Sequence, residues 1–261
     1  MVSTPLMSVQ LYSVRDALAA DPAATLARLA ALGLRNVETF DFVRRVPELA
    51  AALQGAGLAA PTGHAGFLSD QLGSGAAAPT REQTFAAAAE LGLQVVIDPF
   101  VPPARWADRD EIARTADLLN AAAVEAAAYG LRVGYHNHAH EFAHSFDGVT
   151  GYEVLVAHLD DAVVLELDAY WAAIGGQDAA ALADRLGSRL VAVHVKDGST
   201  ADPATAPQGQ VPAGDGDVPL DAVLDAAQSL DYAVLEFDVY DGDIFAGIDA
   251  GVRYLAGRGI R

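Results

Sequence analysis

The sequence predicts an α/β fold, a single (β/α)8 TIM barrel that spans residues 1–261. Three observations predict it. One pattern recurs four times: a helical stretch ends at a glycine, a leucine follows, and a short apolar strand then ends in polar residues, with the glycines at Gly33, Gly57, Gly92 and Gly130. The strands are apolar, which is typical of parallel strands buried on both faces. A chain of 261 residues, 52% of them hydrophobic, can bury one large core.

The predicted elements alternate along the chain. A first strand is expected at 8–14. Asp21 and Pro22 are typical of a helix start, and this helix runs to Gly33 before a strand that ends at Glu38. The remaining strands are expected at 61–64, 95–98, 131–135, 163–168, 190–194 and 233–238, and further helices at 80–91, 108–129, 178–186, 219–230 and 246–255.

Two features complete the predicted architecture. No G-x-G-x-x-G motif follows the first strand, which disfavours an open dinucleotide-binding sheet. Residues 198–218, rich in Ala, Pro, Gly and Asp, are expected to form a flexible lid or active-site loop.

Composition narrows the function classes. Sixteen basic against 35 acidic residues give a net charge of −19, which disfavours nucleic acid and anionic membrane surfaces as partners. The absence of cysteine excludes disulfides, thiolate zinc sites and cysteine nucleophiles. The first residues do not resemble a signal peptide, and no apolar run is long enough for a membrane span. The expectation is a cytoplasmic protein.

Acidic groups and imidazoles follow the predicted strands, and four histidines fall between His136 and His144. In a barrel, the chemistry lies at the carboxyl ends of the strands. Groups of this kind that converge from several strands need a cation between them, and the oxygen and nitrogen donors suit one divalent ion: Mn, Co, Mg or Zn. The strand-end residues are Arg15, Glu38, His64, Asp98, the stretch 136–141, Glu166 with Asp168, His194 with Lys196, and Glu236 with Asp238.

Several motifs lie around the predicted strand ends. They are Gln10-Leu11-Tyr12-Ser13-Val14-Arg15-Asp16, Val37-Glu38, Tyr135-His136-Asn137-His138 with Glu141-Phe142, Glu166-Leu167-Asp168-Ala169-Tyr170-Trp171, His194-Val195-Lys196-Asp197, Gly214-Asp215-Gly216 and Glu236-Phe237-Asp238. In this order and spacing they resemble the motifs of the sugar phosphate isomerase/epimerase family, in its YHNHxxEF branch. This family belongs to the xylose-isomerase-like TIM barrels, which also include endonuclease IV-type enzymes.

The resemblance implies one divalent metal, held by Asp168, His194 and Glu236 together with a carboxylate from the fifth strand. Relatives often have Glu at that strand end, where this chain has His136, with Glu141 five residues further on. Either Glu141 folds back as the fourth ligand or an imidazole replaces it. We favour Glu141, which leaves His136 or His138 free as an acid or base.

The implied activity is the isomerisation or epimerisation of a sugar or keto sugar through a metal-stabilised enediolate. His138, Glu141 and Glu236 are the expected proton carriers, and Lys196 would balance oxyanion charge. Glu38, His64, His136, Asn137 and Trp171 are the residues expected to bind substrate.

Three alternatives remain open. A 3-keto-glycoside lyase or deglycosidase would use the same metal and base. An endonuclease IV-like nuclease would normally need more metal ligands and a basic groove. A non-catalytic sugar-binding protein would lack the metal. No basic cluster supports a phosphorylated substrate, and the resemblance suggests a homo-oligomer.

Overall fold

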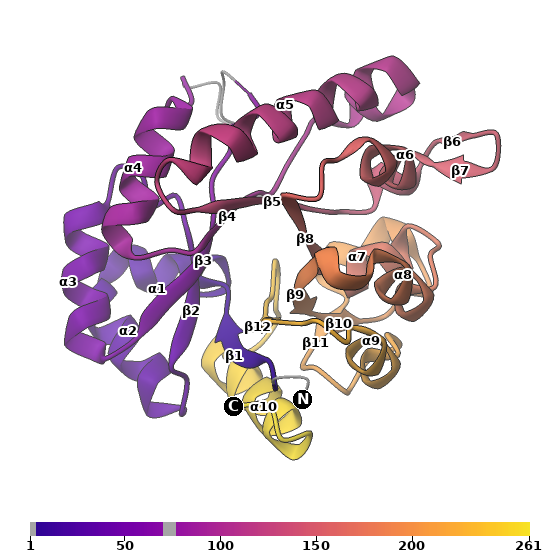
Figure 1. The fold of residues 1–261 in the computed structure, drawn as a ribbon. Helices are drawn as coiled ribbons and strands as arrows, with labels where there is room; N and C mark the ends of the chain where they lie inside the picture. The colour runs from indigo at the N-terminus through magenta and orange to yellow at the C-terminus, as the bar shows by residue number, and fades with distance from the viewer. Residues whose placement is uncertain (1–3, 70–76) are drawn as a thin grey trace.

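Eight parallel strands form one sheet that curls into a nearly closed barrel (Figure 1). The computed structural model describes residues 4–69 and 77–261. The sheet order is β1 (Leu6–Val9), β12 (Tyr232–Leu235), β9 (Leu190–Val195), β8 (Val163–Asp168), β5 (Arg132–His136), β4 (Val95–Asp98), β3 (Ala59–His64) and β2 (Asn36–Phe40). Its two edge strands meet at a parallel bridge between Gln10 and Glu38. The predicted (β/α)8 TIM barrel is confirmed.

Helices surround the strands on the outside of the barrel (Figure 1). They are α1 (Arg15–Ala20), α2 (Pro22–Ala31), α3 (Val46–Ala56), α4 (Arg81–Leu91), α5 (Arg109–Ala127), α6 (Gly151–His158), α7 (Ala169–Ile174), α8 (Ala179–Leu186), α9 (Leu220–Ala226) and α10 (Ile244–Gly257). Short 3-10 turns lie at Leu11–Val14, Pro103–Ala107, His140–Phe142, Gly187–Arg189 and Pro203–Gln208. None of the helices in the described part of the chain is long and apolar enough to cross a membrane.

Local signals in the sequence set several helix boundaries. The Asp21 side chain accepts a hydrogen bond from the backbone N–H of Ala24 and so caps α2. Thr80 and Gln83 form the reciprocal capping box that starts α4. Gly92 ends α4 with a φ of 78°, a left-handed conformation that glycine adopts without strain.

The structure corrects the predicted ends of the first and last strands. The expected strand at 8–14 is β1 followed by a 3-10 turn, because the Gln10 side chain accepts a hydrogen bond from the Tyr12 N–H and caps that turn. The expected strand at 233–238 ends at Leu235, so Glu236 and Asp238 lie just beyond it. The expected loop at 198–218 contains β11 (Gln210–Val211), paired antiparallel with β10 (Asp197–Gly198). A second hairpin, β6 (Ser145–Phe146) with β7 (Val149–Thr150), precedes α6.

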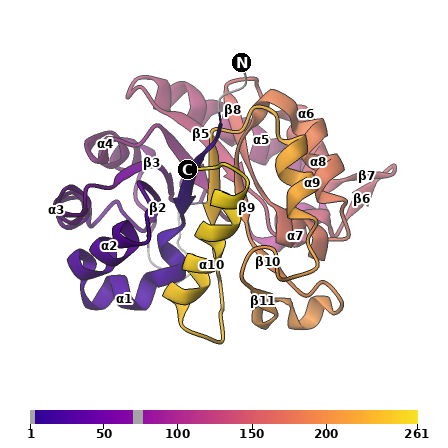
Figure 2. The same cartoon turned by 90° about the horizontal axis from the view of Figure 1, so that it is seen from below.

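The inside of the barrel has an apolar layer below a polar one. The apolar layer consists of Val95, Ile97, Val164, Val191, Ala192, Tyr232 and Val234. Two residues further along three of these strands, on the same face, lie Glu166, His194 and Glu236. Figure 2 shows β1 pointing from the N-terminus towards the end of the barrel where β10 and β11 lie. The polar layer therefore lies towards the carboxyl ends of the strands.

Candidate functional site

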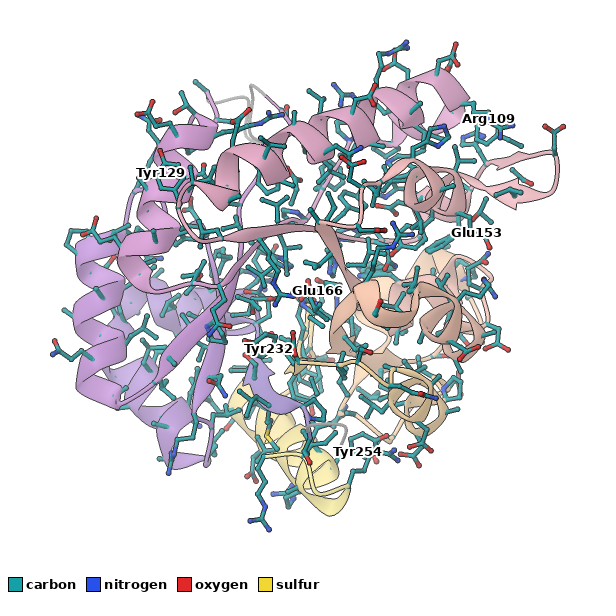
Figure 3. All side chains as sticks on the ribbon, viewed as in Figure 1. Arg109, Tyr129, Glu153, Glu166, Tyr232 and Tyr254 are labelled. Atoms are coloured by element: carbon teal, nitrogen blue, oxygen red, sulfur yellow. The ribbon has the colours of Figure 1, made fainter. Side chains whose placement is uncertain are left out.

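Glu166 lies in the interior of the barrel (Figure 3). Its carboxylate contacts three imidazoles of the polar layer. Its Oε2 is 2.6 Å from His64 Nε2, 3.0 Å from His136 Nδ1 and 3.1 Å from His194 Nε2. Burial alone would raise the pKa of Glu166, but the charges of His194 and His64 outweigh it and hold the pKa well below its usual range. Glu166 is therefore an ionised acceptor that orients the rings around it.

Glu38 joins the same cluster from β2. Its Oε1 accepts a hydrogen bond from Gln10 Nε2 at 2.8 Å and lies 2.7 Å from His194 Nε2 and 3.2 Å from His64 Nε2. The parallel bridge between Gln10 and Glu38 brings these two residues together where the barrel closes. Closure of the barrel thus fixes one side of the His194 ring.

The other side of the His194 ring faces two carboxylates. Its Nδ1 is 2.7 Å from Glu236 Oε2 and 3.9 Å from Asp168 Oδ2. Strand register explains the proximity, because Asp168 of β8 pairs with His194 of β9. Burial raises the pKa of Asp168 to about 6, and the nearby Lys196 charge opposes that rise. Asp168, His194 and Glu236 each offer a ligand atom within 4.8 Å of the others.

Lys196 carries its ammonium group to these carboxylates. Its Nζ is 2.8 Å from Asp168 Oδ2, 2.7 Å from Glu236 Oε2 and 2.8 Å from Asp238 Oδ2. Lys196 is only 1% exposed, so the ion pairs are shielded from water. Burial opposes the charge of Lys196, but Asp168 and Asp238 outweigh it and hold the pKa well above its usual range. A fixed positive charge therefore lies between three carboxylates.

The imidazole of His136 lies between Asp168 and Glu166. Its Nε2 is 3.9 Å from Asp168 Oδ2, while its Nδ1 meets Glu166. Burial lowers the pKa of His136 to about 3, so the ring is neutral at pH 7 and can offer a lone pair. His136 and His194 thus each direct one nitrogen towards the same carboxylate oxygen and the other towards Glu166.

The carboxylate of Glu141 is not part of the group of possible metal ligands that Asp168, His194 and Glu236 form. Its Oε1 accepts a hydrogen bond from the Tyr135 hydroxyl at 2.8 Å, and its Oε2 accepts one from the His138 backbone N–H at 2.9 Å. The 3-10 turn at His140–Phe142 directs its side chain back towards β5. Burial raises the pKa of Glu141 to about 7. Its ligand atoms instead group with those of His138 and His140.

Two of the residues expected to bind substrate contact neighbouring residues of the site. Asn137 Oδ1 accepts from the Asp168 N–H at 3.1 Å, and its Nδ2 donates to the Asp168 carbonyl at 3.3 Å. Trp171 donates from Nε1 to Asp238 Oδ2 at 3.0 Å, and its backbone N–H donates to Asp168 Oδ1 at 2.8 Å. These contacts fix the position of Asp168 and Asp238.

A pocket of about 370 Å³ opens onto the site, within the range of small-molecule sites. Four of the sequence-predicted residues line it: His64, His136, His138 and Glu236. The pocket lining does not include the other predicted site residues, which are Glu38, Asn137, Glu141, Asp168, Trp171, His194 and Lys196. The Nδ1 of His138 is buried without a hydrogen-bond partner among the described residues. Burial, with His136 and Lys196 nearby, lowers the pKa of His138 well below its usual range.

Three polar residues of the site were given no specific role from the sequence: Gln10, which lies in the first motif, and Glu166 and Asp238, which were placed among the strand-end residues. For Glu166 and Asp238 the signal was present, because each shares a strand face with an assigned residue two positions away. Gln10 carried no such signal, since its role depends on the strand pairing that closes the barrel.

The comparisons with known proteins agree with this fold. No curated protein sequence matches the chain significantly. Among solved structures, a sugar phosphate isomerase/epimerase from Parabacteroides distasonis superposes with a TM-score of 0.81 at 21% identity, covering 97% of this chain and 98% of that one. A D-allulose 3-epimerase from Methylomonas sp. gives 0.70 at 15% identity, covering 98% and 99%. The IolI protein, solved with a bound zinc atom, gives 0.72 at 15% identity, covering 97% of each chain.

These likenesses show the fold, and the sequence itself shows the family. Residues 26–256 match the family described as xylose isomerase-like TIM barrel, which confirms the resemblance drawn from the sequence motifs at the level of this family. The chain belongs to the xylose isomerase-like TIM barrel family.

Proposed function

We propose that the protein is a divalent-metal-dependent isomerase or epimerase of a sugar or keto sugar. The observation that carries the proposal is the arrangement of His194. One ring nitrogen faces Asp168 and Glu236, and the other meets the carboxylates of Glu38 and Glu166. Histidines that bind metals are typically oriented in this way by a carboxylate on the far nitrogen.

The donor set fits a divalent ion. Asp168, His194 and Glu236 are the proposed ligands, and His136 is the proposed fourth donor in place of Glu141. Two carboxylates and the imidazoles of His136 and His194, which bind metals in the deprotonated form, suit Mn²⁺, Co²⁺, Zn²⁺ or Mg²⁺. The Lys196 ammonium already lies within 2.8 Å of Asp168 Oδ2 and Glu236 Oε2, so these oxygens converge on one positive charge.

The residues around the ion supply the rest of the chemistry. A bound divalent ion would act as a Lewis acid that polarises the substrate carbonyl and stabilises an enediolate. His138 lines the pocket as a neutral imidazole and is the proposed base that removes the proton next to the carbonyl. Glu236, also in the lining, is the proposed carrier on the other face, and Lys196 would balance developing negative charge.

The relatives support a small sugar substrate. The Parabacteroides distasonis protein is named a sugar phosphate isomerase/epimerase, and the Methylomonas protein a D-allulose 3-epimerase. The zinc atom in the IolI protein supports a metal in the same kind of barrel.

Deuterium exchange tests the proposal directly. The protein, loaded with Mn²⁺, is incubated in D2O with a panel of ketohexoses and 3-keto-glycosides, and incorporation of deuterium next to the carbonyl is followed by mass spectrometry. We expect incorporation into at least one sugar, and its loss on chelation and in His138→Gln. Glu125→Gln, a change in an exposed ion pair on α5, serves as the matched control. Absence of exchange with every sugar, at confirmed metal loading, would refute the proposal.

The same experiment separates the second candidate, a 3-keto-glycoside lyase or deglycosidase. One observation favours it: the mouth of the pocket is lined by apolar side chains, which could accommodate a leaving group. Release of free aglycone along with exchange would identify the lyase, whereas retention of the glycosidic bond would identify the isomerase or epimerase.

A further inference from the structure

We infer that this site selects a sugar that carries an aromatic or similarly flat apolar substituent, such as an aryl glycoside, rather than a free or phosphorylated sugar. The inference rests on the proposed function, because it takes the inner end of the pocket to be where the sugar reacts. It concerns the outer end of the same pocket, which the proposed reaction does not use.

The pocket changes character from its inner to its outer end. The inner end presents the polar groups of His64, His136, His138, Glu236 and Asp238. The remainder of the lining is largely apolar, with Tyr12, Phe40, Val43, Ala65, Gly66, Pro79, Pro99 and Phe100. A ligand that satisfies both ends must be polar at one end and apolar at the other.

Two aromatic rings at the mouth are exposed. Phe100 is 47% exposed and Tyr12 is 39% exposed. Large exposed aromatic side chains at the rim of a polar cavity are typical of a surface that a ligand covers. Tyr12 also packs edge-to-face against Phe40, with ring centroids 5.4 Å apart, so this wall is preorganised.

The apolar region begins directly beside the proposed base. The ring of Phe100 lies 6.0 Å, centroid to centroid, from that of His138 and 5.4 Å from that of His140. A sugar that reacts at His138 would therefore place its substituent against Phe100 without a spacer. This distance favours a group attached directly to the sugar ring.

Charge and hydrogen-bonding capacity disfavour two other occupants. Among the lining residues, Arg44 is the single arginine or lysine, against the carboxylates of Asp41, Glu236 and Asp238. At the mouth the charges of Asp41 and Arg44 cancel, so a phosphate would find no net positive charge there. A second sugar ring would need hydrogen-bond partners for its hydroxyl groups. Among the residues that line the mouth, the charged groups are those of Asp41 and Arg44.

Calorimetric titration of the Mn²⁺-loaded protein tests the inference. The probes are matched methyl and phenyl 3-keto-glycosides of several hexoses, which carry the ketone that the proposed reaction needs, together with cellobiose and glucose 6-phosphate. For any hexose that binds, we expect the phenyl glycoside to bind about tenfold more tightly than the methyl glycoside, the gain expected from burying one side of an aromatic ring. Phe100→Ala and Tyr12→Ala should each reduce this preference to about threefold or less, without changing the affinity for the methyl glycoside.

Two control variants distinguish a specific contribution of the aromatic rings at the mouth from a general effect of removing an exposed side chain. Phe100→Leu should retain much of the preference because it keeps an apolar side chain, and Tyr129→Ala removes an exposed aromatic ring that does not line the pocket. Equal affinity for methyl and phenyl glycosides, or tighter binding of cellobiose or glucose 6-phosphate, would overturn the inference. If no glycoside binds while keto sugars still exchange deuterium, the inference fails and the proposed function stands. If neither binding nor exchange occurs, both fail.

Discussion

The Nε2 of His194 lies 2.7 Å from Oε1 of Glu38, although the two residues belong to β9 and β2, which are not neighbours in the sheet. The contact crosses the interior of the barrel and fixes the orientation of the imidazole. Because Nε2 is engaged there, Nδ1 is directed at Asp168 and Glu236. Because Glu38 lies where the barrel closes, the closure of the barrel helps to set the orientation of His194 in the proposed metal site.

Glu38→Gln should weaken metal binding by about 10-fold to 100-fold, the usual effect of removing a carboxylate behind a metal-binding histidine. The glutamine keeps the shape of the side chain but cannot stabilise the ring by charge. Titration with Mn²⁺ and with Zn²⁺ would measure the change, with Glu125→Gln as the control. Unchanged affinity for both ions would show that His194 does not depend on Glu38.

The metal content of variants should show whether His136 or Glu141 is the fourth metal ligand. Asp168→Asn should remove bound metal, and His136→Gln should weaken binding, because these residues surround the proposed site. Glu141→Gln should keep about one ion per chain, since Glu141 is occupied by Tyr135 and the His138 backbone. Elemental analysis after gel filtration checks this. Loss of metal in Glu141→Gln, with His136→Gln unaffected, would restore Glu141 as the ligand.

Lys196→Met should make the protein more dependent on metal. Without the ammonium, the buried carboxylates of Asp168, Glu236 and Asp238 lose their counter-charge, and the metal-free protein should lose about 3 kcal/mol of stability. Added Mn²⁺ should then raise the melting temperature more than it does in the wild type. Arg114→Met, which removes an exposed ion pair with Glu111, is the control. An equal metal-induced shift in both proteins would show that the Lys196 ammonium is not the counter-charge on which these carboxylates depend without metal.

Asp98 should give stability a specific pH dependence. Its Oδ2 accepts hydrogen bonds from the Phe67 and Leu68 N–H groups and its Oδ1 from that of Phe100, so the side chain caps the turn before Pro99. Burial nevertheless raises the pKa of Asp98 from 3.8 to about 6. A carboxyl group whose pKa is higher in the folded protein than in the unfolded chain contributes most to the stability of the fold at pH values below the unfolded-state pKa. That contribution is lost as the pH rises through the folded-state pKa.

Between pH 4.5 and 7, the unfolding free energy of the wild type should therefore fall by about 2 kcal/mol relative to Asp98→Asn. Urea unfolding of both proteins at several pH values measures the difference. A difference that stays constant, or that grows in favour of the wild type with rising pH, would contradict the raised pKa.

Two glycines should respond in opposite directions to alanine. A Cβ at Gly63 in β3 would lie 2.4 Å from Thr39 Oγ1 and 2.7 Å from Leu93 Cδ2, so Gly63→Ala should destabilise the barrel by about 1–3 kcal/mol. Gly55 in α3 has open space at that position, so Gly55→Ala should stabilise by about 0.5–1 kcal/mol. Thermal unfolding distinguishes them, and a stabilised Gly63→Ala would show that the barrel wall can expand there.

The sequence by itself determined the architecture. Glycine ends, caps such as Asp21 and Thr80, and apolar strands of fixed spacing are local signals, and their physical cause lies within a few residues of the chain. The polar residues after each strand could also be located, because a parallel barrel places all strand ends at one end of the molecule.

Tertiary structure alone decided how those residues meet. Whether Glu141 or His136 approaches Asp168 depends on a 3-10 turn and on the Tyr135 hydroxyl, which the strand-end pattern does not specify. The roles of Gln10 and Glu166 depend on closure of the barrel and on strand register, which bring together residues as far apart in sequence as Glu38 and His194. Contacts across the barrel arise from the summed packing of all eight strands, so no local stretch of sequence encodes them.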